Sequence, residues 1–229
     1  MLKKVVLISG GAAVGKTAVL KNIIPLLQSK DLALSVCKID CVATRDGLVY
    51  QNMNIPHVVG ISGDICPDHF LVSNLPELYH WADEKQSDVL LIETAGLCHR
   101  CSPATEQMAA GCVLDCTSSC HAPAQLGPML TYADFVVLTK IDMVSQAERE
   151  IILWKIKELN PTAKLFTVDG LTGYGAEGLA DWLSCFSKET NFDDDVLRHS
   201  MPSGVCSYCV VEKRVGSAYQ QGVVGKIEF

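Results

Sequence analysis

Short apolar segments alternate with amphipathic segments along most of the chain. Almost wholly apolar runs occur at residues 3–9, 32–39, 89–92, 135–138 and 165–168. Such runs are typical of strands that are covered on both faces of a sheet. Apolar residues recur at helical spacing in residues 17–29, 68–84, 104–112, 145–159 and 178–187. The alternation predicts an α/β fold with a doubly wound, mostly parallel sheet and helices on both faces.

Two parts of the chain depart from this alternation. Residues 114–127 carry Cys, Ser, His and Pro without periodicity, which predicts a long loop or a segment organised by a ligand. After residue 188 the alternation stops, and residues 219–229 have the pattern of a short hairpin. We therefore predict a main domain over residues 1–188, with a cysteine-rich insert at about 98–121, and a small cysteine-containing tail over residues 189–229.

Composition excludes several classes of protein. The 229 residues are 48% hydrophobic and carry a formal net charge of −7, with no cluster of Lys or Arg. We expect no nucleic-acid partner, because such proteins need a basic surface for the phosphates. The apolar runs are too short to span a bilayer, and the apolar start lacks a signal-peptide cleavage site. We therefore expect no membrane association and a cytoplasmic location.

The first apolar run leads into a glycine-rich segment that matches Gly-x4-Gly-Lys-Ser/Thr at every fixed position. It comprises Gly10, Gly11, Ala12, Ala13, Val14, Gly15, Lys16 and Thr17, and Ala18 follows in the predicted helix. Backbone N–H groups and the helix N-terminus would bind phosphates. Lys16 would reach the β and γ oxygens, and Thr17 would bind magnesium. The segment predicts a P-loop nucleotide site, the alternative being a chance glycine turn.

Two later segments indicate which base is bound. Thr139, Lys140 and Asp142 follow the apolar run 135–138. A carboxylate at Asp142 can accept hydrogen bonds from both N1–H and the exocyclic amine of guanine, a donor pair that adenine lacks. Gly170 and Leu171 open a glycine-rich segment after the next strand, placed to close over the base. The combination favours GTP over ATP, although a solvated loop would also fit the Lys-x-Asp pattern alone.

A further motif carries a resemblance to a known family. Glu93-Thr94-Ala95-Gly96 follows a buried strand and resembles the Glu-Ser/Thr-x-Gly of the SIMIBI-class metallochaperone GTPases HypB, UreG and the CobW-like proteins. The likeness covers about residues 3–187, with three departures: Thr139 replaces the usual Asn, and Tyr174 and Ala176 alter the base loop.

This resemblance implies a slow P-loop GTPase. It places Glu93 near the magnesium and the attacking water, with Gly96 as the switch glycine. It places Asp40 in the first switch, where the alternative is a plain surface turn residue. Phosphoryl transfer requires mainly positioning and charge neutralisation, which Lys16, Thr17, magnesium and these carboxylates can provide.

Cys66-Pro67-Asp68-His69 resembles the Cys-Pro-His or Cys-His metal motif of the hydrogenase and urease chaperones. A thiolate with an imidazole suits nickel, zinc or copper(I). Two ligands, Cys66 and His69, are too few for a closed site, and a symmetric dimer would supply four. The alternative is a buried cysteine with a helix-capping histidine.

Eleven cysteines are unusual for a chain of this kind, because a reducing compartment disfavours disulfides. Three groups stand out: Cys98 with Cys101, then Cys112, Cys116 and Cys120, and Cys206 with Cys209. If this segment is helical, the spacing of four places the three cysteines of the middle group along one side of the helix. Cysteine-only ligand sets suit both zinc and iron–sulfur clusters, and their abundance near a switch favours a redox-active cluster.

The other cysteines divide in two. Cys37 and Cys41 border the first switch and could join the ligand set, whereas we expect Cys185 to be a core residue.

The leading hypothesis is a GTP-hydrolysing maturation factor that carries a metal ion or iron–sulfur cluster to a client metalloenzyme. Nucleotide would change the geometry of a homodimer and hence the shared sulfur site. Two alternatives remain open: a nucleotide-driven electron donor with a dimer-bridging cluster, and a regulatory module whose cysteines bind structural zinc.

Overall fold

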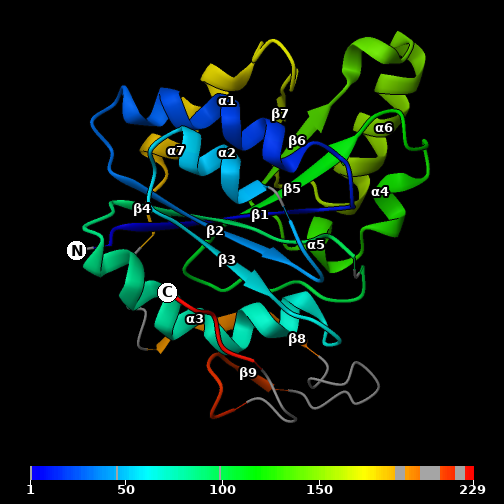
Figure 1. Ribbon diagram of the computed structural model, residues 1–229. Helices are drawn as coiled ribbons and strands as arrows, with labels where there is room; N and C mark the ends of the chain where they lie inside the picture. Colours follow the sequence, from blue (N-terminus) through cyan, green and yellow to red (C-terminus); the bar gives the residue numbers. More distant parts are fainter. Residues whose placement is uncertain (1, 45, 98, 189–193, 202–211, 220–224) are drawn as a thin grey trace.

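A seven-stranded parallel sheet forms the centre of the protein (Figure 1). The computed structural model describes residues 2–44, 46–97, 99–188, 194–201, 212–219 and 225–229. The strand order is β3-β2-β4-β1-β5-β6-β7. Their bounds are β1 Lys4–Gly10, β2 Leu34–Asp40, β3 His57–Ile61, β4 Val89–Glu93, β5 Ala109–Asp115, β6 Phe135–Thr139 and β7 Lys164–Thr167.

Helices cover both faces of this sheet, so the predicted α/β class is confirmed. One face carries α1 (Lys16–Gln28), α2 (Asp46–Asn52) and α7 (Ala176–Cys185). The other carries α3 (Pro67–Glu84), α6 (Gln146–Leu159) and the short helices α4 (Ala122–Gln125) and α5 (Pro128–Thr131). Each strand serves both layers: in β1, Val6 and Ile8 pack with the α1 face and Val5 and Leu7 with the α3 face. This double coverage explains why the strands read as continuous apolar runs.

One predicted helix is wrong. Residues 104–112 read as helical, but β5 occupies Ala109–Asp115 between β1 and β6. A short apolar run cannot be assigned to helix or strand by periodicity alone. Tertiary packing decides here: a Cβ added at Gly111 would lie 2.3 Å from the Phe135 ring. The small residue therefore fits a central strand against a large aromatic neighbour.

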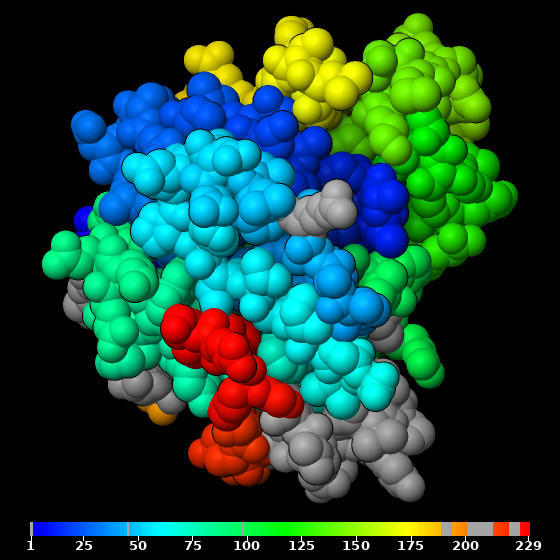
Figure 2. All heavy atoms as spheres, viewed as in Figure 1, coloured from blue at the N-terminus to red at the C-terminus, as the bar shows by residue number. Residues whose placement is uncertain are grey.

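The tail also differs from expectation. Its described strands are β8 (Val196–Met201) and β9 (Glu212–Arg214), which pair antiparallel, and the described residues 225–229 of the predicted hairpin form no strand. Residues 225–229 instead lie across α3, shown in red in Figure 2. Asn74 of α3 bonds to the backbone of both Gly225 and Ile227, and Ile227 is buried. The tail therefore packs directly on the nucleotide-binding body.

All strands of the main sheet are parallel, so their carboxyl ends meet at one edge. The 3-10 helix η1 (Ile141–Met143) follows β6 at this edge. Ligands of doubly wound sheets bind at such an edge. Among the described residues, every helix is too short or too polar to span a lipid bilayer.

Candidate functional site

The P-loop joins β1 to α1 and is shaped by close backbone packing. Gly10 has φ 132°, and a Cβ there would lie 2.2 Å from the Val113 carbonyl oxygen, so glycine is required. The Lys16 ammonium donates to the carbonyl oxygens of Gly10 at 3.2 Å and Gly11 at 2.6 Å. Burial lowers the pKa of Lys16 to about 8. A cation therefore lies inside the loop in which the phosphates would bind.

Glu93 is the centre of a buried hydrogen-bond network at the end of β4. Its carboxylate accepts from Thr17 Oγ1, Lys38 Nζ and the Tyr50 hydroxyl, each at 2.7 Å. Glu93 is only 1% exposed. A buried carboxylate needs such partners. These three hydrogen bonds explain how Glu93 can be buried at the end of the strand.

Three members of this network were not predicted: Lys38, Asp46 and Tyr50. Lys38 also pairs with Asp46 Oδ2 at 3.1 Å. Burial acts to lower the pKa of Lys38, but the attraction and hydrogen bonds of Glu93 and Asp46 outweigh it and raise the pKa. Burial, with the nearby Glu93 charge, raises the pKa of Tyr50. A lysine inside the apolar run 32–39 was the available signal for a buried counterion.

The oxygen atoms beside the P-loop suit a magnesium ion. Thr17 Oγ1 lies 2.7 Å from Glu93 and 3.4 Å from Asp46 Oδ2, which gathers one hydroxyl and two carboxylates. Such oxygen donors are the ligands that magnesium prefers. Asp40 ends β2 and accepts from the Cys41 N–H at 2.8 Å. Asp46 rather than Asp40 therefore contacts Thr17, and a magnesium role for Asp40 stays a prediction.

Gly96 packs against the P-loop. It has φ 75°, and a Cβ there would lie 2.0 Å from the Gly10 carbonyl oxygen and 2.7 Å from Lys16 Nζ. A larger residue would occupy the space beside the phosphate-binding lysine. The backbone after Glu93 therefore lies where it can respond to a γ-phosphate.

Thr139 supports the P-loop from β6. It is buried, and its hydroxyl donates to the Val14 carbonyl at 2.7 Å. A Cβ at Gly15 would lie in contact with the Thr139 side chain, at 3.6 Å. The residue that replaces the usual Asn thus ties the base segment to the phosphate loop.

Lys140 and Asp142 follow at the start of the base segment. Lys140 has φ 54°, and its ammonium pairs with Asp115 at the end of β5. Burial acts to raise the pKa of Asp115, but hydrogen bonds from Lys140 and Thr117 lower it below its usual value. Asp142 is exposed in η1. The carboxylate predicted to bind guanine is therefore accessible.

The second base loop lies against α1. Gly170 accepts at its carbonyl from Asn22 Nδ2 at 3.0 Å, and a Cβ there would lie 3.0 Å from that of Ala18. Asp169 accepts from the Leu171 N–H at 2.8 Å and from the Thr172 hydroxyl at 2.6 Å. Leu171 is 97% exposed. The second base loop therefore packs beside the start of α1, whereas its role in binding the base stays a prediction.

Comparison with known proteins decides the family. The model of the CobW/HypB/UreG nucleotide-binding domain matches residues 4–167. The chain belongs to the CobW/HypB/UreG family. It is 42% identical over 225 residues to the uncharacterized protein MJ0120 of Methanocaldococcus jannaschii, covering 98% of this chain and 96% of that protein. It is 26% identical over 212 residues to the urease accessory protein UreG of Yersinia pestis, covering 86% and 92%.

Solved structures show the same fold. HypB from Archaeoglobus fulgidus aligns with TM-score 0.61 at 21% identity, over 79% of this chain and 89% of that one. HypB from Helicobacter pylori, in complex with nickel, aligns with TM-score 0.62 at 18% identity, over 82% and 92%. The family match confirms the predicted HypB/UreG/CobW-like membership, and these structures show the shared fold.

In this member of the CobW/HypB/UreG family, Cys66 and His69 lie at the start of α3. Cys66 is the half-buried residue before the helix, and His69 is fully buried in its first turn. Asp68 between them is buried, which raises its pKa to about 7, and the Lys16 charge acts in the opposite direction. Asp68, between the two predicted metal ligands, therefore lies close enough to Lys16 for the lysine charge to affect its pKa.

The middle cysteine group does not lie along a helix. Cys112 is buried in β5, Cys116 is buried just after it, and half-buried Cys120 lies in a turn before α4. Burial raises the pKa of Cys112 to about 12 and that of Cys116 to about 11. Burial therefore favours the neutral thiol at both positions in the metal-free protein, and the ligand roles of Cys112 and Cys116 stay predictions. The segment is not helical, so the condition for a shared helical side is not met.

The remaining cysteines have different surroundings. Cys101 and Cys37 are buried, and burial raises the pKa of Cys37. Cys41 Sγ accepts from the Ser62 hydroxyl at 3.6 Å. Cys185 is exposed at the end of α7, so its expected core position was wrong. Cys98, Cys206 and Cys209 lie outside the described residues, within which no three Cys, His, Asp or Glu side chains form a group that could hold a metal.

Proposed function

We propose that this protein is a GTP-hydrolysing metallocentre maturation factor, which binds a metal ion or iron–sulfur cluster and delivers it to a client metalloenzyme. The observation that carries the proposal is the network joining Glu93 to Thr17 and Lys38 beside the P-loop. Family membership supports it, since the relatives include urease accessory proteins UreG and a HypB solved with nickel.

The nucleotide chemistry follows from this network. Lys16 would leave its carbonyl partners, which are those of Gly10, Gly11 and Ala95, and neutralise charge on the β- and γ-phosphates. Magnesium, when held by Thr17 and Glu93, would neutralise the remaining phosphate charge. Glu93 would orient the water whose oxygen bonds to the γ-phosphorus while the bond to the bridging oxygen breaks. Because its carboxylate already accepts three hydrogen bonds, we expect slow intrinsic turnover.

The metal-binding part of the proposal rests first on Cys66. It follows the loop after β3 and precedes α3. Asp68 lies in the first turn of this helix, and the Lys16 charge acts to lower its pKa. Nucleotide binding at Lys16 would therefore change the electrostatic surroundings of the Cys66 motif. A nickel or zinc ion held by Cys66 would bind with an affinity that depends on the nucleotide.

The two Cys-x2-Cys pairs form the second part. Thr105 bridges antiparallel to Leu197, and the neighbouring backbone bonds are Glu106 to Val196 and Arg198 to Ala104. β8 therefore runs antiparallel to residues 104–106, in the direction that leads toward Cys101. This direction supports one site made from Cys98, Cys101, Cys206 and Cys209, which suits an iron–sulfur cluster or zinc.

A nucleotide-dependent homodimer would complete the site. Large apolar side chains are exposed at the sheet edge that carries the phosphate site: Val42 by 82%, Leu48 by 57%, Ile61 by 41% and Leu97 by 59%. They come from α2 and from segments that end the neighbouring strands β2, β3 and β4. Exposed apolar groups gathered in this way favour a protein partner. We propose that the partner is a second copy of this chain.

Anaerobic purification with metal and sulfide analysis tests the function. Absorbance near 400 nm would identify a cluster. Retention is then measured with a GTP analogue, with GDP and without nucleotide, in the natural protein and in Cys98→Ser/Cys101→Ser. Cys185→Ser is the matched control, since that thiol is exposed on α7. We expect retention to differ between nucleotide states, with affinities that differ by about 5–150-fold, the factor that corresponds to typical coupling energies of about 1–3 kcal/mol.

The outcomes separate the alternatives. Equal retention in all three states, or undiminished retention in the double variant, would refute the coupling. Zinc retained equally with and without nucleotide would favour the regulatory module with structural zinc. Reduction of an acceptor during GTP hydrolysis would favour the electron donor.

A further inference from the structure

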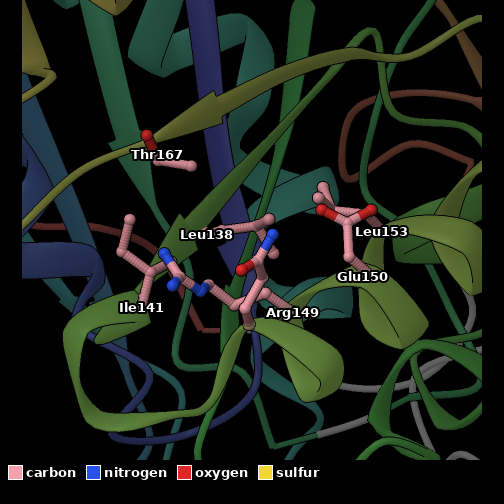
Figure 3. A pocket seen from close by; sticks show the side chains of 7 residues that line it. Leu138, Ile141, Arg149, Glu150, Leu153 and Thr167 are labelled. Carbon is pink, nitrogen blue, oxygen red and sulfur yellow. The ribbon is translucent and has the colours of Figure 1, made fainter.

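A pocket of about 230 Å³ lies on the α6 side of the sheet (Figure 3). Its walls come from the ends of β6 and β7, from η1 and from the first three turns of α6. The nucleotide site lies on the other side, since Val14 of the P-loop packs with the α1 layer and Leu138 of the pocket with the α6 layer. The pocket is therefore separate from the phosphate site.

One wall of the pocket is apolar. Leu138, Ile141 and Leu153 line it and carry branched aliphatic side chains. Ile141 belongs to η1, the segment that also carries Asp142. A ligand in this pocket would contact η1 on the side that faces α6. The part of the ligand that touches these three side chains would be apolar.

Arg149 is the positively charged residue among the side chains that line the pocket. Its Nε is buried without a hydrogen-bond partner among the described residues, and its guanidinium forms no ion pair with them. Figure 3 shows the side chain extending from α6 toward Ile141. A buried donor without a partner is costly, and a planar guanidinium matches the two oxygens of a carboxylate or phosphate. An anion bound in the pocket would give this donor a hydrogen-bond partner.

The other polar residues narrow the kind of anion. Gln146 and Thr167 offer an amide and a hydroxyl, and Glu150 places a second charge at the pocket, opposite in sign to Arg149. The Glu150 carboxylate would repel a dianion such as phosphate more strongly than a monoanion. The volume corresponds to about eight water molecules. A ligand of similar size would have one carboxylate and a short branched chain.

We propose that this pocket binds a small organic monocarboxylate, with its carboxylate on Arg149 and its apolar chain against Leu138, Ile141 and Leu153. The site is independent of the metal chemistry proposed above, because none of the proposed sulfur ligands lines it.

Saturation-transfer NMR and calorimetric titration with 4-methylpentanoate test the site on the full-length protein. The neutral amide of the same acid keeps the apolar chain and removes the charge, and inorganic phosphate tests a simple anion. Arg149→Gln removes the guanidinium, and Arg149→Lys keeps a charge without the fork. Lys157→Gln is the matched control, because it removes one positive charge from an exposed position on the same helix.

We expect 4-methylpentanoate to bind the natural protein and Lys157→Gln equally. Its affinity should fall about 10–100-fold in Arg149→Gln, the loss expected for hydrogen bonds to a charged group, and less in Arg149→Lys. Circular dichroism would verify that each variant is folded. Absence of binding to the natural protein, equal binding of the amide, tighter binding of phosphate, or unchanged affinity in folded Arg149→Gln would each overturn the proposal.

Discussion

Replacing Lys38 with methionine should strongly destabilise the nucleotide-free protein. The Lys38 ammonium lies 2.7 Å from Glu93 Oε1 and 3.1 Å from Asp46 Oδ2. The side chains of Lys38 and Glu93 are 6% and 1% exposed. Methionine fills much of the same volume but carries no charge. The variant therefore leaves the Glu93 carboxylate buried with only the Thr17 and Tyr50 hydroxyls.

The size of the effect follows from the geometry. At an effective dielectric constant of about 20, unit charges 2.7 Å apart attract by about 6 kcal/mol. Desolvation of the two ions offsets most of this attraction in the intact pair, but it remains uncompensated when one partner is removed. We expect a loss of about 3–5 kcal/mol in the free energy of unfolding. The melting temperature should fall by about 6–20 °C for a chain of this size.

Urea unfolding followed by circular dichroism measures this loss for Lys38→Met, Glu93→Gln and the double variant. Urea is chosen because, unlike guanidinium chloride, it does not screen charges. Lys3→Met is the matched control, since Lys3 pairs with Asp88 at a similar 2.8 Å but is 72% exposed. That exposed pair should contribute no more than about 1 kcal/mol.

The double variant removes both charges, so it should be more stable than Lys38→Met alone. A loss below about 1 kcal/mol for Lys38→Met would refute the reasoning. The reasoning would also be refuted if the loss in the double variant equalled the sum of the two single losses, because the buried pair would then not be the cause of the destabilisation.

Three further predictions concern the nucleotide. Burial lowers the pKa of Lys16 to about 8, so in the free protein its ammonium loses a proton as the pH rises through that value. The affinity for a fluorescent GDP analogue should therefore fall by up to about tenfold per pH unit above pH 8. Lys16→Ala should abolish both this dependence and GTP hydrolysis, and wild-type hydrolysis in it would contradict the P-loop assignment. Asp142→Asn should exchange guanine for xanthine preference in competition binding, whereas unchanged GTP affinity would place the base elsewhere. Thr139→Val should lose the bond to Val14, costing about 1 kcal/mol of stability in urea unfolding and weakening GDP binding, while Thr139→Ser retains both.

Local motifs were readable from the sequence because their chemistry depends on neighbouring residues in the chain. The P-loop places Lys16 and Thr17 at the start of α1, as expected, and Glu93 ends a buried strand. The strands at residues 34–40, 89–93 and 135–139 were found for the same reason: coverage on both faces leaves a continuous apolar run. The ligand roles of the cysteines remain predictions, including those of the buried Cys112 and Cys116.

Some elements could not be assigned from local pattern. β3 is short and half-exposed, with the burial of its residues alternating, so it gave no continuous apolar run. α2 has only seven residues and buries only Tyr50. β5 became a strand because its small residues fit between β1 and the Phe135 ring. Each depends on what packs against it.

The sequence by itself determined the fold class, the phosphate loop and the acidic residue beside it, since each is encoded within one continuous segment. Only the tertiary structure decided what surrounds Glu93. In the parallel register of β2 and β4, Lys38 lies directly opposite Glu93, and α2 adds Asp46 and Tyr50. These residues are between 43 and 55 positions from Glu93. Strand order and register bring them together, and both are set by packing across the whole sheet rather than by local sequence.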